Sequence, residues 1–136
     1  MKKKKTTHLL SYAGQKQRFA RSVVAGDFVF LSGSSGRTLE TGEVSSDDVR
    51  DQTRVAMDKI RLALEEAGTS MENIVKVLIY FKDMKDYEAV KKTEFEYWEK
   101  YAPGLAAEPP ASTVCAVVSL SKPNMLVEFD VTALRG

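Results

Sequence analysis

A carboxylate on an alternating strand is the first feature of this sequence that suggests chemistry. Residues 126–134 predict a strand whose β-branched and aromatic side chains share one face, while Glu128 and Asp130 lie on the other. A carboxylate that faces another surface needs a counter-charge or a ligand, because burying it alone is costly. Two interpretations are open: Glu128 forms an ion pair between subunits, or it serves a bound ligand.

The single cysteine lies on the preceding predicted strand, at 112–119. Ala111, Thr113 and Cys115 alternate onto one face of this strand. No histidine or cation stands beside Cys115 in the sequence to stabilise a thiolate. A small core residue is therefore the simpler interpretation, and a nucleophile is the alternative.

A charged pair interrupts the apolar stripe of a helix predicted over 87–101. Glu94 falls between Val90 and Tyr97 on that stripe, and Lys91 precedes it at the spacing of a helical ion pair. We expect both charged side chains to extend to solvent at the border of the stripe. The alternative is that the pair lies at the edge of a binding cleft.

Several kinds of chemistry are excluded by residue types that are scarce. The chain has one histidine, His8, and one cysteine, so neither an intrachain disulfide nor a metal site of several histidines or cysteines is available within one chain. No glycine-rich phosphate loop is present either. We expect no metal and no cofactor.

Length and charge indicate a single domain over residues 1–136, with enough apolar material for a core. Without the lysines at positions 2–5, 16 basic residues face 19 acidic ones, so we expect no nucleic-acid partner. We interpret residues 1–6 as a disordered basic tail, with contact to nucleic acid or anionic lipid as the alternative.

The most apolar stretch, 74–81, is too short to cross a membrane, and we expect a cytoplasmic protein.

Apolar periodicity predicts the elements that position these side chains. Strands are expected at 18–24, 28–33 and 74–82, and helices from 47 or 48 to 67 and over 87–101. With the two C-terminal strands the order is β-β-α-β-α-β-β. This order predicts an α/β (α+β) fold in which two helices pack on one face of a mixed sheet.

The second face of that sheet also carries apolar side chains. The strands at 28–33 and 74–82 are apolar on both faces, although two helices cover only one side. Another copy of the chain is the simplest cover for the other side. We therefore predict a homo-oligomer with its sheets facing inward.

Several segments, in order along the chain, resemble the RidA/YjgF family. Residues 25–33 (AGDFVFLSG) are similar to the strand pair VGDFVFVSG of that family, and residues 52–90 are similar to its first helix and its FLKDMxDFxxV segment. Residues 110–114 and 126–130 resemble its PARSTV and LVEIEA strands. The resemblance covers about residues 18–134, nearly the whole chain.

This resemblance implies a chorismate-mutase-like fold that forms a homotrimer, with small-molecule clefts between subunits. The best-known members hydrolyse reactive enamines and imines to keto acids and ammonia. In those members an arginine binds the substrate carboxylate and a glutamate positions the attacking water. Older names of the family are endoribonuclease and translation inhibitor.

Part of the implied site is present in this sequence. Ser32 and Gly33 match the family's cleft-lining Ser-Gly pair, and Glu128 matches its catalytic glutamate. The strand face with Thr113 and Cys115 corresponds to the face that lines the cleft in the family. The resemblance therefore implies that Glu128 positions water, with polar contacts from these neighbours.

Other family positions are substituted. The arginine falls on Ala111, the cleft tyrosine on Phe19 and an asparagine of the second helix on Lys91. One hydrogen bond to a charged group contributes about 1.5–3 kcal/mol, so losing it weakens carboxylate binding by about 10- to 150-fold. Lys91 and Arg21 are the candidates for the missing cation, since Arg21 lies on the same side of its strand as Phe19.

Three functions follow from this partial match. The first is hydrolysis of imine-type or related small molecules, with a substrate range altered by Ala111. The second is a non-catalytic trimer that binds a metabolite or a partner protein. RNA cleavage is a weaker third hypothesis, because no general acid or base other than Glu128 supports it.

Overall fold

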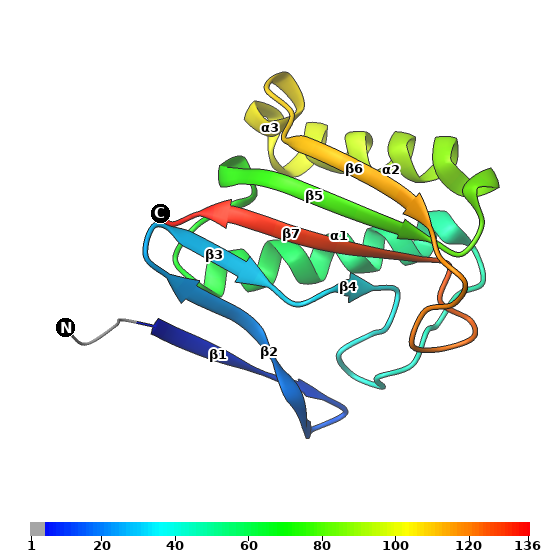
Figure 1. The fold of residues 1–136 in the computed structure, drawn as a ribbon, viewed down its shortest axis with the longest axis horizontal. Helices are drawn as coiled ribbons and strands as arrows, with labels where there is room; N and C mark the ends of the chain where they lie inside the picture. Colours follow the sequence, from blue (N-terminus) through cyan, green and yellow to red (C-terminus); the bar gives the residue numbers. More distant parts are fainter. Residues whose placement is uncertain (1–4) are drawn as a thin grey trace.

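One mixed sheet of seven strands carries two long helices on one of its faces (Figure 1). The structure is a computed structural model that describes residues 5–136. The strands are β1 (Lys5–Tyr12), β2 (Gln15–Ala25), β3 (Phe28–Leu31), β4 (Ser34–Ser35), β5 (Ile74–Phe81), β6 (Ala111–Ala116) and β7 (Val127–Leu134). The helices are α1 (Val49–Glu66), α2 (Tyr87–Tyr101) and α3 (Pro103–Ala107), with single 3₁₀ turns η1 (Met71–Asn73) and η2 (Met84–Asp86). Across the sheet the order is β1-β2-β3-β7-β5-β6, and β4 pairs with β7.

The predicted helices and strands are confirmed, with ends shifted by a few residues. The structure adds β1, the two-residue β4 and the short helix α3. The prediction of a tail over residues 1–6 was wrong for Lys5 and Thr6, which pair with Ala25 and Val24 of β2. Hydrogen bonding to β2 orders these polar residues. The other lysines of the basic run lie outside the described residues.

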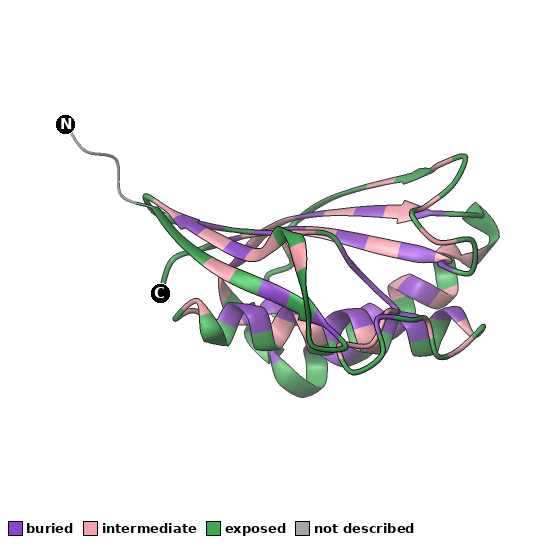
Figure 2. Cartoon of the chain, turned by 90° about the horizontal axis from the view of Figure 1, so that it is seen from below, coloured by how far each residue is buried: buried purple, intermediate pink, exposed green. Residues whose placement is uncertain are grey.

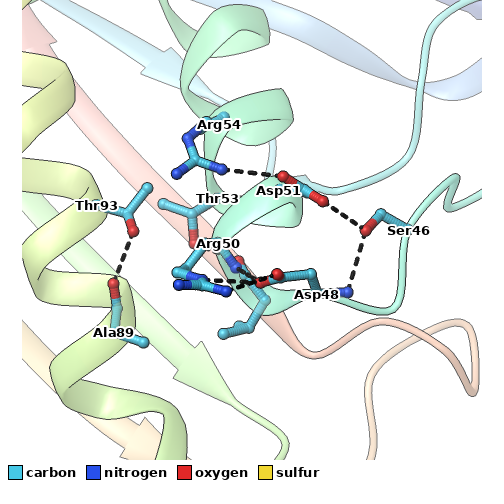
Figure 3. A network of polar contacts seen from close by, with 9 residues as sticks. Ser46, Asp48, Arg50, Asp51, Thr53, Arg54, Ala89 and Thr93 are labelled. Atoms are coloured by element: carbon cyan, nitrogen blue, oxygen red, sulfur yellow. Dashed lines mark hydrogen bonds and ion pairs between the residues drawn. The ribbon is translucent and has the colours of Figure 1, made fainter.

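Helix α1 begins at a capping aspartate. The Asp48 carboxylate accepts a hydrogen bond from the backbone N–H of Arg50 at 2.9 Å, and Ser46 Oγ donates to Asp51 at 2.9 Å (Figure 3). These contacts satisfy a free donor of the first turn and place negative charge at the positive end of the helix dipole. The cap fixes the start of α1, whose later residues reach the site described below.

The core lies between the sheet and the helices (Figure 2). Phe81 of β5 and Phe129 of β7 are fully buried against the helical layer, which contributes Ile60 and Leu64 of α1. Full burial of one such side chain contributes about 1.5–3 kcal/mol. The alternation predicted for the last strand is confirmed, so Glu128 lies on the face away from the helices.

That outer face is apolar where β3 begins and β7 ends, in the middle of the sheet. Phe28 and Phe30 are 41% and 46% exposed, and Leu134 is 42% exposed. Phe28 pairs with Leu134 and Phe30 with Thr132, so these side chains share one face. The expected uncovered second face is therefore present in the single chain.

Candidate functional site

Glu128 lies beside a glycine that makes room for its carboxylate. Its backbone pairs with Ser35 of β4, and a Cβ atom at Gly33 would collide with Glu128 Oε1. The carboxylate thus occupies the space that a side chain at residue 33 would fill. Glu128 is half-buried, and its side-chain carboxylate forms neither a hydrogen bond nor an ion pair with the rest of residues 5–136. A desolvated carboxylate without a partner is available to a ligand or water.

The carboxylate borders a cleft of about 300 Å³. Hydroxyl, aromatic and charged side chains converge there, and the lining consists of Tyr12, Phe19, Ser32, Gly33, Ser35, Arg37, Ser121, Met125 and Glu128. A concave site with a few convergent polar groups is typical of small-molecule binding.

Buried Gln52 of α1 holds together the loops that form one wall of this cleft. Its Nε2 donates to the backbone oxygens of Ser46 and Asn124 at 2.8 and 3.0 Å, and its Oε1 accepts from the N–H of Leu126 at 2.9 Å. Its side chain also packs so closely on Gly36 that a Cβ there would collide with it. One side chain thereby fixes the loop before β7 and the loop after β4.

Arg37 brings a positive charge into the same cleft. Its Nε donates to the carbonyl of Gly42 at 2.8 Å, and its guanidinium carbon lies 4.0 Å from the centre of the Tyr12 ring. Within residues 5–136 no carboxylate lies within 4.0 Å of this guanidinium. Stacking and one hydrogen bond orient the group, and its terminal nitrogens are left to bind an anion.

A narrower cavity of about 30 Å³ adjoins the cleft. It shares Tyr12, Ser32 and Gly33 with the cleft. Lys59 of α1 and Arg21 of β2 also line it. The Lys59 ammonium donates to the Tyr12 hydroxyl at 3.4 Å. Helix α1 therefore places a cation, Lys59, in the cavity that Ser32 and Gly33 also line.

The charges of this site are coupled. Burial raises the pKa of the Glu128 carboxyl above its ordinary value of 4.5, and Asp130 acts in the same direction, while Lys59 and Arg37 oppose the rise. Burial lowers the pKa of Lys59 to about 8; the charge of Arg37 adds to this effect, and Glu128 opposes it. Glu128 is therefore a better proton acceptor than an exposed glutamate.

The structure brings together four of the site residues that the sequence suggested. Phe19, Ser32 and Gly33 line the cleft with Glu128. Arg21 lies at the adjoining cavity, where its guanidinium forms an ion pair of 3.6 Å with a carboxylate of α1. Its charge is therefore partly neutralised and lies outside the cleft lining.

The positions on β6 lie on the same sheet face as Glu128 but at the far edge. Cys115 and Glu128 both pair with Tyr80 of β5, one from each side. Two strand spacings separate them, roughly 10 Å. Ala111 and Thr113 occupy the same exposed strand, and none of these three lines the cleft of its own chain. The interpretation of Cys115 as a core residue was wrong, because an edge strand leaves its side chain exposed.

Lys91 and Glu94 form the predicted ion pair, at 2.7 Å, but not at the cleft. The expectation that both extend to solvent was wrong for Glu94, which is 1% exposed beneath α2. Burial raises the pKa of Glu94, and Lys91 opposes this rise. The pair belongs to the packing of the helix on the sheet.

Sequence reasoning missed Tyr12, Arg37 and Lys59. Tyr12 ends β1, a strand that the sequence analysis did not predict and whose first two residues it assigned to a disordered tail. Arg37 follows Gly33 by only four residues, which was an available signal. Lys59 lies between Ala56 and Ala63 at helical spacing, so it borders the apolar stripe of α1.

The part of the chain that the structure describes holds no helix long and apolar enough to cross a membrane. Over the same residues, 5–136, no three His, Cys, Asp or Glu side chains are grouped to hold a metal ion.

The chain is similar to known proteins along nearly its whole length. The family model described as Endoribonuclease L-PSP matches residues 11–135. A RutC family protein of Pyrococcus horikoshii is 30% identical over 117 residues, 86% of this chain and 86% of that protein. A 2-iminobutanoate/2-iminopropanoate deaminase of Dermatophagoides farinae is 27% identical over 112 residues, 82% of this chain and 81% of that protein. The crystal structure of the YjgF gene product of E. coli matches with a TM-score of 0.82 at 25% identity, covering 96% of this chain and all of that one.

Proposed function

The chain belongs to the RidA/YjgF family of endoribonuclease L-PSP proteins and has its chorismate-mutase-like fold, and from this membership we propose that it hydrolyses imines of small 2-oxo acids. A relative of similar length is named for deamination of 2-iminobutanoate and 2-iminopropanoate, which supports this substrate class. The products are a 2-oxo acid and ammonia.

The observation that carries the proposal is the unpaired carboxylate of Glu128 at the cleft. In the proposed reaction this carboxylate takes a proton from a water whose oxygen bonds to the imine carbon. That proton passes to the imine nitrogen, which gives a carbinolamine. The carbinolamine hydroxyl then loses its proton, which Glu128 passes to the nitrogen as the carbon–nitrogen bond breaks, so that ammonia leaves and the 2-oxo acid remains. Gly33 lets the carboxylate lie close to the backbone, where a larger residue would displace it.

Arg37 supplies the anion contact that Ala111 lacks. Arg37 lines the same cleft as Glu128, and its guanidinium has no carboxylate partner within the described residues. A hydrogen bond from a guanidinium to a carboxylate contributes about 1.5–3 kcal/mol, so Arg37→Met should raise KM for an acidic imine by about 10- to 150-fold. A neutral imine should be much less affected.

We further propose that three copies assemble with their outer sheet faces together. The exposed side chains of Phe28, Phe30 and Leu134, and the exposed edge strand β6, support this assembly. In such a homotrimer β6 of one subunit lies against the cleft of the next, as the family resemblance implies. Sedimentation at several concentrations should give the trimer mass, and a monomer would contradict it. The free thiol of Cys115 fits a reducing compartment such as the cytoplasm.

The test couples an amino-acid oxidase to the protein and follows ammonia release from the imines formed. The wild-type chain should exceed the spontaneous rate, and Glu128→Gln should lose that excess. Asp130→Asn is the matched control, because it neutralises the next carboxylate on the same strand face, which does not line the cleft. Equal loss in both variants, or no acceleration by the wild type, would contradict the proposal. Ligand binding without turnover would instead support a non-catalytic trimer.

A further inference from the structure

The structure places one amine beside the cleft without a counter-ion. Lys59 projects from α1 into the narrow cavity that shares Tyr12, Ser32 and Gly33 with the cleft. In the described part of the chain no carboxylate lies within 4.0 Å of its Nζ, and its hydrogen-bond partner is the Tyr12 hydroxyl at 3.4 Å. The cavity admits water or the reactive end of a small molecule.

The surroundings of this amine favour its neutral form. Tyr12 of β1 and Arg21 of β2 line its cavity, Arg37 stacks on the Tyr12 ring, and Glu128 of β7 acts on it from the cleft. Burial and the charge of Arg37 lower the pKa of Lys59 to about 8. About a tenth of such an amine is neutral at pH 7, against less than a thousandth of an exposed lysine. Desolvated lysines near another cation are the ones that act as nucleophiles.

We propose that Lys59 is a carbonyl-capturing nucleophile that forms a Schiff base with 2-oxo acids and their imines. Arg37 favours this class of ligand because it binds a carboxylate beside the electrophilic carbon. The Lys59 nitrogen bonds to the carbon of a 2-oxo acid and water leaves, or to that of an imine and ammonia leaves. Water then adds to the Schiff base, the bond to Lys59 breaks, and the 2-oxo acid and free amine are regenerated.

The covalent route for imines rests on the proposed function, whereas capture of the 2-oxo acid does not. Glu128 serves the water step in both routes, so Glu128→Gln should leave capture intact while hydrolysis is lost. Lys59→Arg distinguishes a nucleophilic role of this side chain from a purely electrostatic one, because a guanidinium keeps the positive charge and cannot form the Schiff base.

The test incubates the whole protein with pyruvate and cyanoborohydride, which reduces a Schiff base to a stable amine, and maps the adduct by mass spectrometry. Lys59 should be labelled at least about 10-fold faster than exposed Lys92, with labelling rising through pH 8 as the amine loses its proton. Lys59→Arg should abolish this adduct, and Lys92→Arg should leave it unchanged. Mapping the wild-type chain decides the question even where a variant folds poorly.

The outcomes separate this inference from the proposed function. Labelling of Lys59 without imine hydrolysis would support capture and contradict the deaminase. Hydrolysis with Lys59 labelled no faster than Lys92 would overturn the inference and leave the deaminase standing. Normal turnover in Lys59→Arg would likewise overturn a covalent step in catalysis.

Discussion

Replacing Gln52 with alanine tests how the cleft is held in shape. The side chain is 1% exposed and makes three hydrogen bonds to the backbone of two loops, to Ser46, Asn124 and Leu126. Each bond contributes about 0.5–1.5 kcal/mol net, which gives about 3 kcal/mol for the three. For a domain of this size that loss lowers Tm by about 10 °C.

Urea unfolding of Gln52→Ala, monitored by circular dichroism, measures the loss of stability. The imine assay on the folded variant measures the loss of turnover. Turnover should fall as well, because the loop before β7 carries Ser121 and Met125 of the cleft lining. Gln17→Ala is the matched control, since Gln17 makes one local hydrogen bond at the surface and its loss should cost less than about 0.5 kcal/mol. A Gln52→Ala variant as stable as this control would refute the assigned role of Gln52.

Three further substitutions test the cleft and the buried charge of α2. Gly33→Ala should reduce turnover by about 100-fold with the fold intact by circular dichroism, because its Cβ displaces the Glu128 carboxylate; unchanged turnover would contradict this placement. Glu94→Gln should become more stable relative to wild type as the pH rises above 4.5. The pKa of Glu94 is raised in the folded protein, so the wild type loses stability as this carboxyl ionises. Urea titrations of both proteins at several pH values measure this, and a stability difference that does not change with pH would contradict it. Ala111→Arg should lower KM for an acidic imine by about 10- to 150-fold if a neighbouring subunit presents this residue to the cleft, and an unchanged KM would argue against that arrangement.

The helices could be predicted because their apolar residues recur in the sequence with the period of an α-helix. The apolar residues of α1 recur at helical spacing, Asp48 provides its cap, and the buried positions follow the expected stripe. The last strand was equally clear, because its alternation placed Glu128 on the outer face. Local patterns of this kind determine which side of an element is buried.

The parts that were missed depend on contacts between distant segments. Polar β1 is ordered by pairing with β2, and no alternation strong enough to predict a strand stands out in its sequence. Helix spacing places Lys59 at the border of a stripe but does not tell which cavity its long side chain enters. Arg37 is oriented by Tyr12 and Gly42, which only the folded loops bring to it. The motif-based residues of the cleft were identified, and so was Arg21 at the adjoining cavity, but Arg37 and Lys59 were not.

The pH dependence of imine hydrolysis tests the central role of Glu128 most directly. The enzyme-dependent kcat/KM, corrected for the spontaneous rate at each pH, should fall on acidification with a midpoint above 4.5, because burial raises the pKa of the Glu128 carboxyl and its ionised form accepts the proton. Glu128→Gln should lose the acceleration over this whole range. Acceleration that persists in Glu128→Gln with the same acid limb would show that another group accepts the proton, and the account of the cleft would be wrong.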